Sequence, residues 1–226
     1  MTPPATAPSP IRLVVFDWDG TLMDSTAAIV EAIQGAAADL ALPVPDARRA
    51  SHVIGLGLHD ALRHAVPDLA ADRLPDFVDR YRHHYLRRDA GLRLFDGVRE
   101  MLAALRAHPS VLVAVATGKS RVGLERAFDS TGLRPMFIDS RCADEGLPKP
   151  DPWMLVDLCE TLGVDAAATV MVGDTTHDLG MARAAGAHGL GVAWGAHPRD
   201  VLEAFGPLAL FDDVPSLDAW LRARLP

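Results

Sequence analysis

The chain has 226 residues, of which 49% are hydrophobic and 23% are charged. This composition excludes disordered and fibrous proteins, and the length suffices for one large domain or for one domain with an insert. Thirty acidic residues outnumber 22 basic ones, and the formal net charge of -8 argues against a nucleic-acid or anionic-membrane partner. Lysine is scarce, because every basic residue except Lys119 and Lys149 is arginine.

The cysteines and the N-terminal segment bear on the compartment. Cys142 and Cys159 have neither the number nor the spacing of a disulfide framework or a zinc site. Met1–Pro10 is rich in proline and alanine, lacks the basic start and apolar run of a signal peptide, and is predicted to be a flexible tail. No later run reaches the length of about 18 apolar residues that a membrane span needs. We therefore expect a cytoplasmic protein.

Short apolar runs that end in polar residues recur along the chain, as buried strands of a parallel sheet do. Helical patterns, with apolar residues at i, i+3 and i+4, separate several of them. This alternation predicts an α/β protein with a doubly wound, mostly parallel sheet, which binds ligands at the carboxyl ends of its strands. The runs are Ile11–Phe16, Val111–Ala116, Thr169–Val172 and, more weakly, Leu190–Trp194 and Leu208–Phe211.

Residues 23–94 break the alternation. They contain three helical stretches and no convincing strand. The sequence therefore predicts an inserted helical domain at 23–94 and an α/β core made of residues 11–22 and 95–226. The helical stretches are Ser25–Leu40, Pro45–Ala65 and Leu74–Arg88.

Polar side chains follow the predicted strands at the edge where a site is expected. Asp17 and Asp19 follow the first strand, Thr117 and Asp174 follow two later ones, and Lys149 lies in a proline-rich loop. Carboxylates gathered at one point need a cation, and Mg²⁺ binds carboxylate and phosphate oxygens. One carboxylate could then attack a phosphate while a second acts first as acid and then as base, and Asp17 and Asp19 suit these roles.

Four short motifs occur in the order that one known family shows. The chain thereby resembles the haloacid dehalogenase-like hydrolase superfamily over residues 11 to about 220. The motifs are Asp17-Trp18-Asp19-Gly20-Thr21, Thr117-Gly118-Lys119, Lys149-Pro150-Asp151-Pro152 and Gly173-Asp174-Thr175-Thr176-His177-Asp178.

The resemblance implies roles for the acidic residues. Asp17 would be the nucleophile and Asp19 the general acid and base. The magnesium ligands would be Asp17, Asp174 and the backbone carbonyl of Asp19. Asp178 would not bind the metal itself but would contact the residues that do. A carboxylate there could instead stabilise the start of a helix.

The resemblance also implies how the phosphate is held and covered. Thr117, Gly118 and Lys149 would bind the phosphate oxygens. The insert at 23–94 corresponds in position to the helical cap that members of the family carry between their first and second motifs.

Two features narrow the resemblance. Dehalogenases lack the acid that this chain has at Asp19, and phosphonatases place a Schiff-base lysine in the cap, whereas residues 23–94 contain no lysine. Strings such as Phe95-Asp96-Gly97-Val98 look most like the phosphoglycolate phosphatase branch. The implied function is a magnesium-dependent phosphatase that hydrolyses a small phosphorylated metabolite through an aspartyl-phosphate, as a monomer or a homodimer.

Several alternatives stay open at this stage. A phosphomutase or pyrophosphatase of the same superfamily would use the same residues, and a phosphoacceptor signalling module combines similar ones on a similar fold. The sequence leaves open whether Arg48, Arg49, Arg63 or the Gly55–Gly57 loop contacts the substrate. It also assigns no role to His177.

Overall fold

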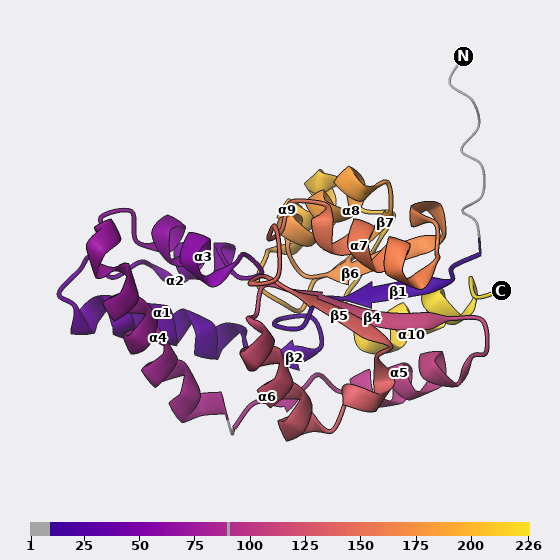
Figure 1. The fold of residues 1–226 in the computed structure, drawn as a ribbon, viewed down its shortest axis with the longest axis horizontal. Coiled ribbons are helices and arrows are strands. Elements are labelled where there is room, and N and C mark those ends of the chain that lie inside the picture. The colour runs from indigo at the N-terminus through magenta and orange to yellow at the C-terminus, as the bar shows by residue number, and fades with distance from the viewer. Residues whose placement is uncertain (1–9, 90) are drawn as a thin grey trace, which may run out of the picture.

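The computed structural model describes residues 10–89 and 91–226, so the predicted tail at 1–10 lies outside the described residues apart from Pro10. Its main sheet has six strands in the order β5-β4-β1-β6-β7-β8, and all neighbouring pairs are parallel (Figure 1). The strands are β1 (Leu13–Phe16), β4 (Leu112–Thr117), β5 (Asp139–Cys142), β6 (Thr169–Gly173), β7 (His188–Val192) and β8 (Ala209–Phe211).

Helices cover both faces of this sheet. Val14 and Phe16 of β1 belong to the apolar cluster that includes α5, α6 and α10, whereas Leu13 and Val15 belong to the cluster that includes α7 and α8. Successive side chains of a strand point to opposite faces, so this division is the expected one. The predicted doubly wound, mostly parallel α/β fold is confirmed. The helices are α5 (Val98–Ala107), α6 (Arg121–Thr131), α7 (Trp153–Leu162), α8 (Thr176–Ala185), α9 (Arg199–Phe205) and α10 (Val214–Arg222).

A group of helices lies beside the carboxyl edge of the sheet, at the left of Figure 1. It has its own apolar cluster, in which Ile33, Leu62 and Phe77 are fully or almost fully buried. Within the described residues, no helix is both long and apolar enough to cross a membrane. The helices of this group, here called the cap, are α1 (Thr26–Asp39), α2 (Ala47–His52), α3 (Leu58–Ala65) and α4 (Leu74–Asp89), with a 3-10 turn at Ala71–Arg73.

The structure corrects three expectations. The stretch predicted as helical at Pro45–Ala65 is divided into α2 and α3, because Gly55 has a φ of +90° that no helix accommodates. Two short strands, β2 (Met23–Asp24) and β3 (Arg93–Leu94), pair antiparallel inside the segment expected to have no strand. Strand β5 was not predicted, because its sequence Asp-Ser-Arg-Cys is polar, as an edge strand allows.

Candidate active site

The carboxyl ends of β1, β4 and β6 bring the predicted site residues together. Asp17 follows β1, Thr117 ends β4, and Asp174 follows β6, and all three side chains are buried. The backbone N–H of Asp17 donates to the Val172 carbonyl of the neighbouring strand at 2.9 Å. Hydrogen bonding within the sheet therefore fixes the backbone position of Asp17.

The two carboxylate oxygens of Asp17 have different surroundings. Oδ1 accepts a hydrogen bond from the Trp18 N–H at 2.6 Å and lies 2.9 Å from Lys149 Nζ. Oδ2 is buried and has no hydrogen-bond partner among the described residues. Burial raises the pKa of Asp17 to about 7; Lys149 opposes the rise and the charge of Asp178 adds to it. One oxygen is thus held in place and the other is left for a ligand.

Lys149 lies between two carboxylates. Its ammonium is fully buried, 2.9 Å from Asp17 Oδ1 and 2.7 Å from Asp178 Oδ1. Burial disfavours its charge, yet Asp17 and Asp178 raise its pKa above the ordinary value, so the side chain remains an ammonium. Removing either carboxylate would leave a buried charge underpaired, which is costly.

Asp178 serves two purposes at the start of α8. It is the third residue of the helix and forms a capping box with Thr175, whose N–H and hydroxyl donate to Asp178 Oδ2 at 3.1 and 2.7 Å. The other oxygen, Oδ1, contacts Lys149. The sequence left open whether Asp178 caps the helix or acts through its neighbours. In the structure the side chain both caps α8 and contacts Lys149.

Asp174 is fully buried and tightly surrounded. Its Oδ1 accepts from the Thr21 hydroxyl and its Oδ2 from the Ala196 N–H, each at 2.7 Å. A Cβ at either Gly20 or Gly195 would lie 2.2 Å from Asp174 Oδ2, so both positions require glycine. Burial, together with the charges of Asp17 and Asp178, raises the pKa of Asp174 well above its ordinary value.

These acids suit a hard divalent cation. One oxygen each of Asp17, Asp174 and Asp178 lie within 4.8 Å of one another. Asp178 already uses both oxygens, whereas Asp17 Oδ2 is buried and finds no partner among the described residues, which is a cost that a cation would remove. An all-oxygen donor set is the kind that Mg²⁺ and Ca²⁺ prefer.

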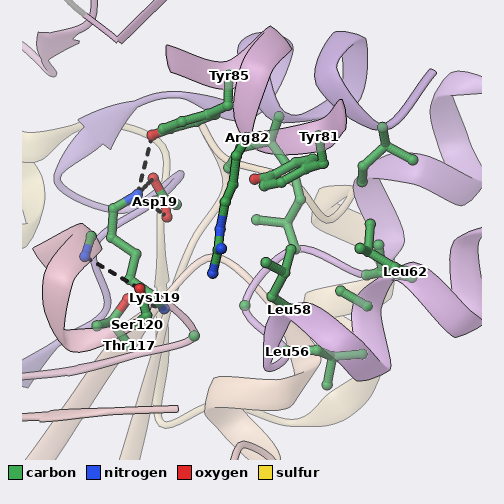
Figure 2. A pocket seen from close by; sticks show the side chains of 18 of the residues that line it. Asp19, Leu56, Leu58, Leu62, Tyr81, Arg82, Tyr85, Thr117, Lys119 and Ser120 are labelled. Carbon is green, nitrogen blue, oxygen red and sulfur yellow. Dashed lines mark hydrogen bonds and ion pairs between the residues drawn. The ribbon is translucent and has the colours of Figure 1, made fainter. Parts of the chain in front are cut away.

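The Asp19 side chain contacts a lysine that the sequence left unassigned. Lys119 Nζ donates to both Asp19 oxygens at 2.9 and 2.8 Å (Figure 2). The Ser25 hydroxyl donates to Asp19 Oδ1 at 2.7 Å. Lys119 also donates to Tyr85 Oη of α4 at 3.1 Å. Burial disfavours the ammonium, but Asp19 and Tyr85 raise its pKa above the usual range. The available signal was the scarcity of lysine, because both lysines of the chain stand at this site.

The loop between α2 and α3 covers the site from the cap side. A Cβ at Gly118 would lie 2.6 Å from the carbonyl oxygens of both Gly55 and Leu56, and one at Gly55 would lie 3.7 Å from Asp17 Oδ2. The Gly55–Gly57 loop, which the sequence left undecided, therefore both separates two helices and approaches the reacting edge of the sheet. Glycine at 55 and at 118 permits this close contact.

The comparisons with known proteins agree with this geometry. The family model described as haloacid dehalogenase-like hydrolase matches residues 14–192, most of the chain. The chain belongs to this family. It is 41% identical to the "Probable phosphatase IndB" of Dickeya dadantii (strain 3937), over 88% of this chain and 89% of the relative. It is 30% identical to the phosphoglycolate phosphatase of Rhodospirillum rubrum, over 95% of this chain and 92% of the relative.

A solved structure of a similar protein has the same fold. A protein from Haemophilus somnus 129pt, described as a predicted phosphoglycolate phosphatase, superposes with a TM-score of 0.82 at 26% identity, covering 92% of this chain and 97% of that one. The family and these relatives support a hydrolase that acts on phosphate esters.

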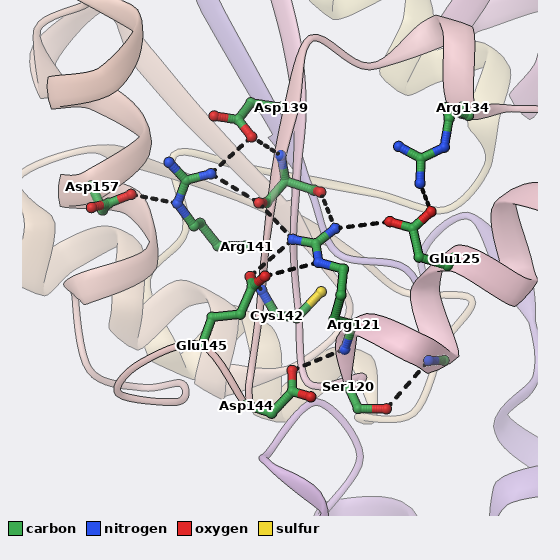
Figure 3. Close-up of polar contacts among 12 residues, drawn as sticks. Ser120, Arg121, Glu125, Arg134, Asp139, Arg141, Cys142, Asp144, Glu145 and Asp157 are labelled. Atoms are coloured by element: carbon green, nitrogen blue, oxygen red, sulfur yellow. Dashed lines mark hydrogen bonds and ion pairs between the residues drawn. The ribbon is translucent and has the colours of Figure 1, made fainter.

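The segment that carries Lys149 is anchored at the edge of the hydrolase core by the contacts in Figure 3. Arg121, the first residue of α6, bonds both oxygens of Glu145 at 2.8 and 2.9 Å, and its N–H donates to Asp144. The Cys142 N–H also donates to Glu145. These contacts fix the loop between β5 and Lys149 and so help to hold the buried lysine in position.

Other residues that the sequence singled out lie elsewhere in this hydrolase. Arg48 and Arg49 line a separate hollow with His52, and Arg63 is exposed on α3. One ring nitrogen of His177, Nε2, lies 2.9 Å from the His52 carbonyl oxygen, so this side chain contacts the cap rather than the acidic cluster. Neither the three arginines nor His177 lines the cavity that contains Asp17, as far as the described residues show.

Replacing Gly118 by alanine tests the approach of the cap loop. The added methyl would meet two backbone carbonyls at 2.6 Å, and Gly118 lacks a left-handed φ, so the change adds a clash without backbone strain. Because reacting groups tolerate little displacement, we expect Gly118→Ala to lower kcat/KM by about 10- to 100-fold. Steady-state kinetics, with thermal unfolding as the control for stability, measure this, and an unchanged kcat/KM would contradict it.

Proposed function

We propose that this hydrolase is a magnesium-dependent phosphatase that releases phosphate from a small phosphorylated metabolite through an aspartyl-phosphate on Asp17. The observation that carries the proposal is Asp17 Oδ2, a buried oxygen to which the described part of the chain offers no partner, at the carboxyl edge of the sheet and beside a buried ammonium. Phosphoglycolate is the reference substrate, because several relatives are named phosphoglycolate phosphatase.

Magnesium would be held by the carboxylates of Asp17 and Asp174 and by the backbone carbonyl of Asp19. When bound, it supplies positive charge that lets an anionic phosphate approach an anionic carboxylate. Asp178 contributes through Lys149 rather than as a ligand, because its oxygens already bond Lys149 and Thr175.

In the first step, a carboxylate oxygen of Asp17 attacks the phosphorus, and the bond between phosphorus and the alcohol oxygen breaks. Asp19 takes up a proton for this step and gives it to the departing oxygen, while Thr117, the N–H of Gly118 and Lys149 bind the phosphoryl oxygens. In the second step, Asp19 takes a proton from a water molecule that attacks the aspartyl-phosphate, which restores Asp17 and releases phosphate.

Asp17→Asn and Asp19→Asn distinguish the two carboxylates. Without the nucleophile, we expect Asp17→Asn to release no phosphate above background. Asp19→Asn keeps the nucleophile but loses the base for the second step, so the protein should accumulate phosphate on Asp17. Phosphate assays and intact-protein mass spectrometry measure these outcomes. Turnover at the wild-type rate in Asp17→Asn would refute the mechanism, and an isomerised substrate in place of free phosphate would indicate a phosphomutase.

Lys119 is proposed to position Asp19. Lys119→Met removes the ion pair to both Asp19 oxygens, so we expect kcat to fall by up to about 100-fold while KM changes little. Lys119→Arg keeps a cation there and should recover part of kcat. If KM rose while kcat stayed constant, Lys119 would instead bind the phosphate.

The raised pKa values predict how strongly magnesium stabilises the fold at each pH. A carboxyl whose pKa is higher in the folded state stabilises the fold below its unfolded pKa, and this contribution is lost as the pH rises through the folded value. Asp17 and Asp174 should therefore weaken the metal-free fold as the pH rises from about 4 to above 7, the value about which Asp17 titrates. Magnesium would offset the loss.

We expect saturating Mg²⁺ to raise the melting temperature by about 5–10 °C at about pH 8 and by much less at about pH 5. Asp174→Asn, which removes one ligand, should abolish most of the increase. Differential scanning fluorimetry with magnesium and with chelator measures it. An equal increase at both pH values would contradict the proposed link between the cation and these carboxyls.

A further inference from the structure

A cavity of ≈ 460 Å³ extends from Asp17 and Thr117 into the cap. Under the proposed function, on which this inference rests, the phosphate lies at Asp17, so the alcohol part of the ester must occupy this cavity. Pockets of roughly 300–1,000 Å³ accommodate ligands of drug size, which is far more than a two-carbon acid fills. The size and lining of the cavity therefore restrict which class of phosphate ester can bind.

The cap side of this cavity is apolar. Figure 2 shows Leu56, Leu58 and Leu62 of the cap facing the polar groups of the core. Isoleucines of α1 and of the loop before α3 complete the wall, and most of these side chains are buried. Such a wall gains free energy by covering apolar substrate surface and leaves a carboxylate unsolvated. The wall consists of Ile29, Ile33, Ile54, Leu56, Leu58 and Leu62.

The cations at the cavity are mostly neutralised by the protein itself. Lys119 pairs with Asp19 at 2.8 Å, and Arg126 pairs with Asp89 at 2.6 Å. Arg82 is exposed on α4 and reaches toward the cavity beside Tyr81 in Figure 2. A small acid bound near Asp17 would thus meet leucine and isoleucine over most of the cap side of the cavity.

Two aromatic rings of α4 favour a flat ligand. Tyr81 and Tyr85 both line the cavity, with ring centroids 5.9 Å apart and planes within 19° of each other. The hydroxyl of Tyr85 is occupied by Lys119, so its ring is held in one place. Aromatic faces stack on planar rings, and an arginine beside them can bond polar atoms at the rim of such a ring.

We propose that the substrate is a phosphate monoester whose alcohol part carries a planar ring, and that the ring lies between the apolar wall and Tyr81. Arg82 then contacts the edge of the ring. Phosphoglycolate fits this cavity poorly, because its carboxylate would be placed against the wall.

Matched pairs of substrates test the proposal in the wild-type enzyme with Mg²⁺. Uridine 5′-monophosphate is compared with ribose 5-phosphate, 2-phenylethyl phosphate is compared with ethyl phosphate, and phosphoglycolate is assayed beside them. In at least one pair the ester with the ring should have a kcat/KM about 10-fold higher or more, and it should exceed phosphoglycolate. The two pairs distinguish a nucleoside from a simple aromatic alcohol as the source of the ring.

Asp17→Asn is assayed on every substrate, so that the two proposals fail in different ways. Phosphate release that depends on Asp17 but shows no preference for a ring, or that favours phosphoglycolate, would overturn this inference and leave the proposed function standing. No Asp17-dependent release from any substrate would overturn both.

Leu58→Asn tests the wall directly, and Leu208→Asn is its matched control. Leu58 is half-buried at the start of α3, whereas Leu208 is exposed on the core, away from the cavity. We expect Leu58→Asn to lower kcat/KM for the preferred ring-bearing ester by about 10-fold and to change its ring-free partner by less than about 3-fold. Leu208→Asn should change neither. If Arg82→Gln abolished activity while Leu58→Asn had no effect, the proposal would be wrong.

Discussion

The buried ammonium of Lys149, between Asp17 and Asp178, is the contact on which the site depends. It fixes one oxygen of Asp17, while the other has no hydrogen-bond partner within residues 10–89 and 91–226. It also links the loop after β5 to the first turn of α8, where Asp178 caps the helix. Asp174 adds a third buried acid beside this pair, so the site holds more acidic groups than one ammonium neutralises, and a divalent cation would balance them once they are ionised.

The cap completes this arrangement through contacts that tolerate little change. The carbonyls of Gly55 and Leu56 lie so close to Gly118 that no side chain fits there. Tyr85 of the cap accepts a hydrogen bond from Lys119, which holds Asp19 of the core. The position of the cap and the position of the proposed acid are therefore coupled by one lysine. The same closed geometry forms the apolar cavity that we propose selects the substrate.

The sequence was most informative where burial and chemistry coincide. The apolar runs before Asp17, Thr117 and Asp174 predicted three central strands and the edge at which these residues meet. Strand β5 was missed because Asp139–Cys142 is polar, and the helical pattern at Pro45–Ala65 did not reveal the break that the φ of Gly55 imposes. Pairings between distant residues, such as Lys119 with Asp19, depend on tertiary packing and had no local signal beyond the scarcity of lysine.

The account's central claim is that a divalent cation balances carboxyls that hold protons in its absence. Calorimetric titration with Mg²⁺, in buffers of different ionisation enthalpy, counts the protons released on binding. Because the pKa of Asp17 is raised to about 7 and that of Asp174 is also raised, binding should release about one proton or more at about pH 6 and fewer at about pH 9. Binding that releases no protons at either pH would contradict the claim.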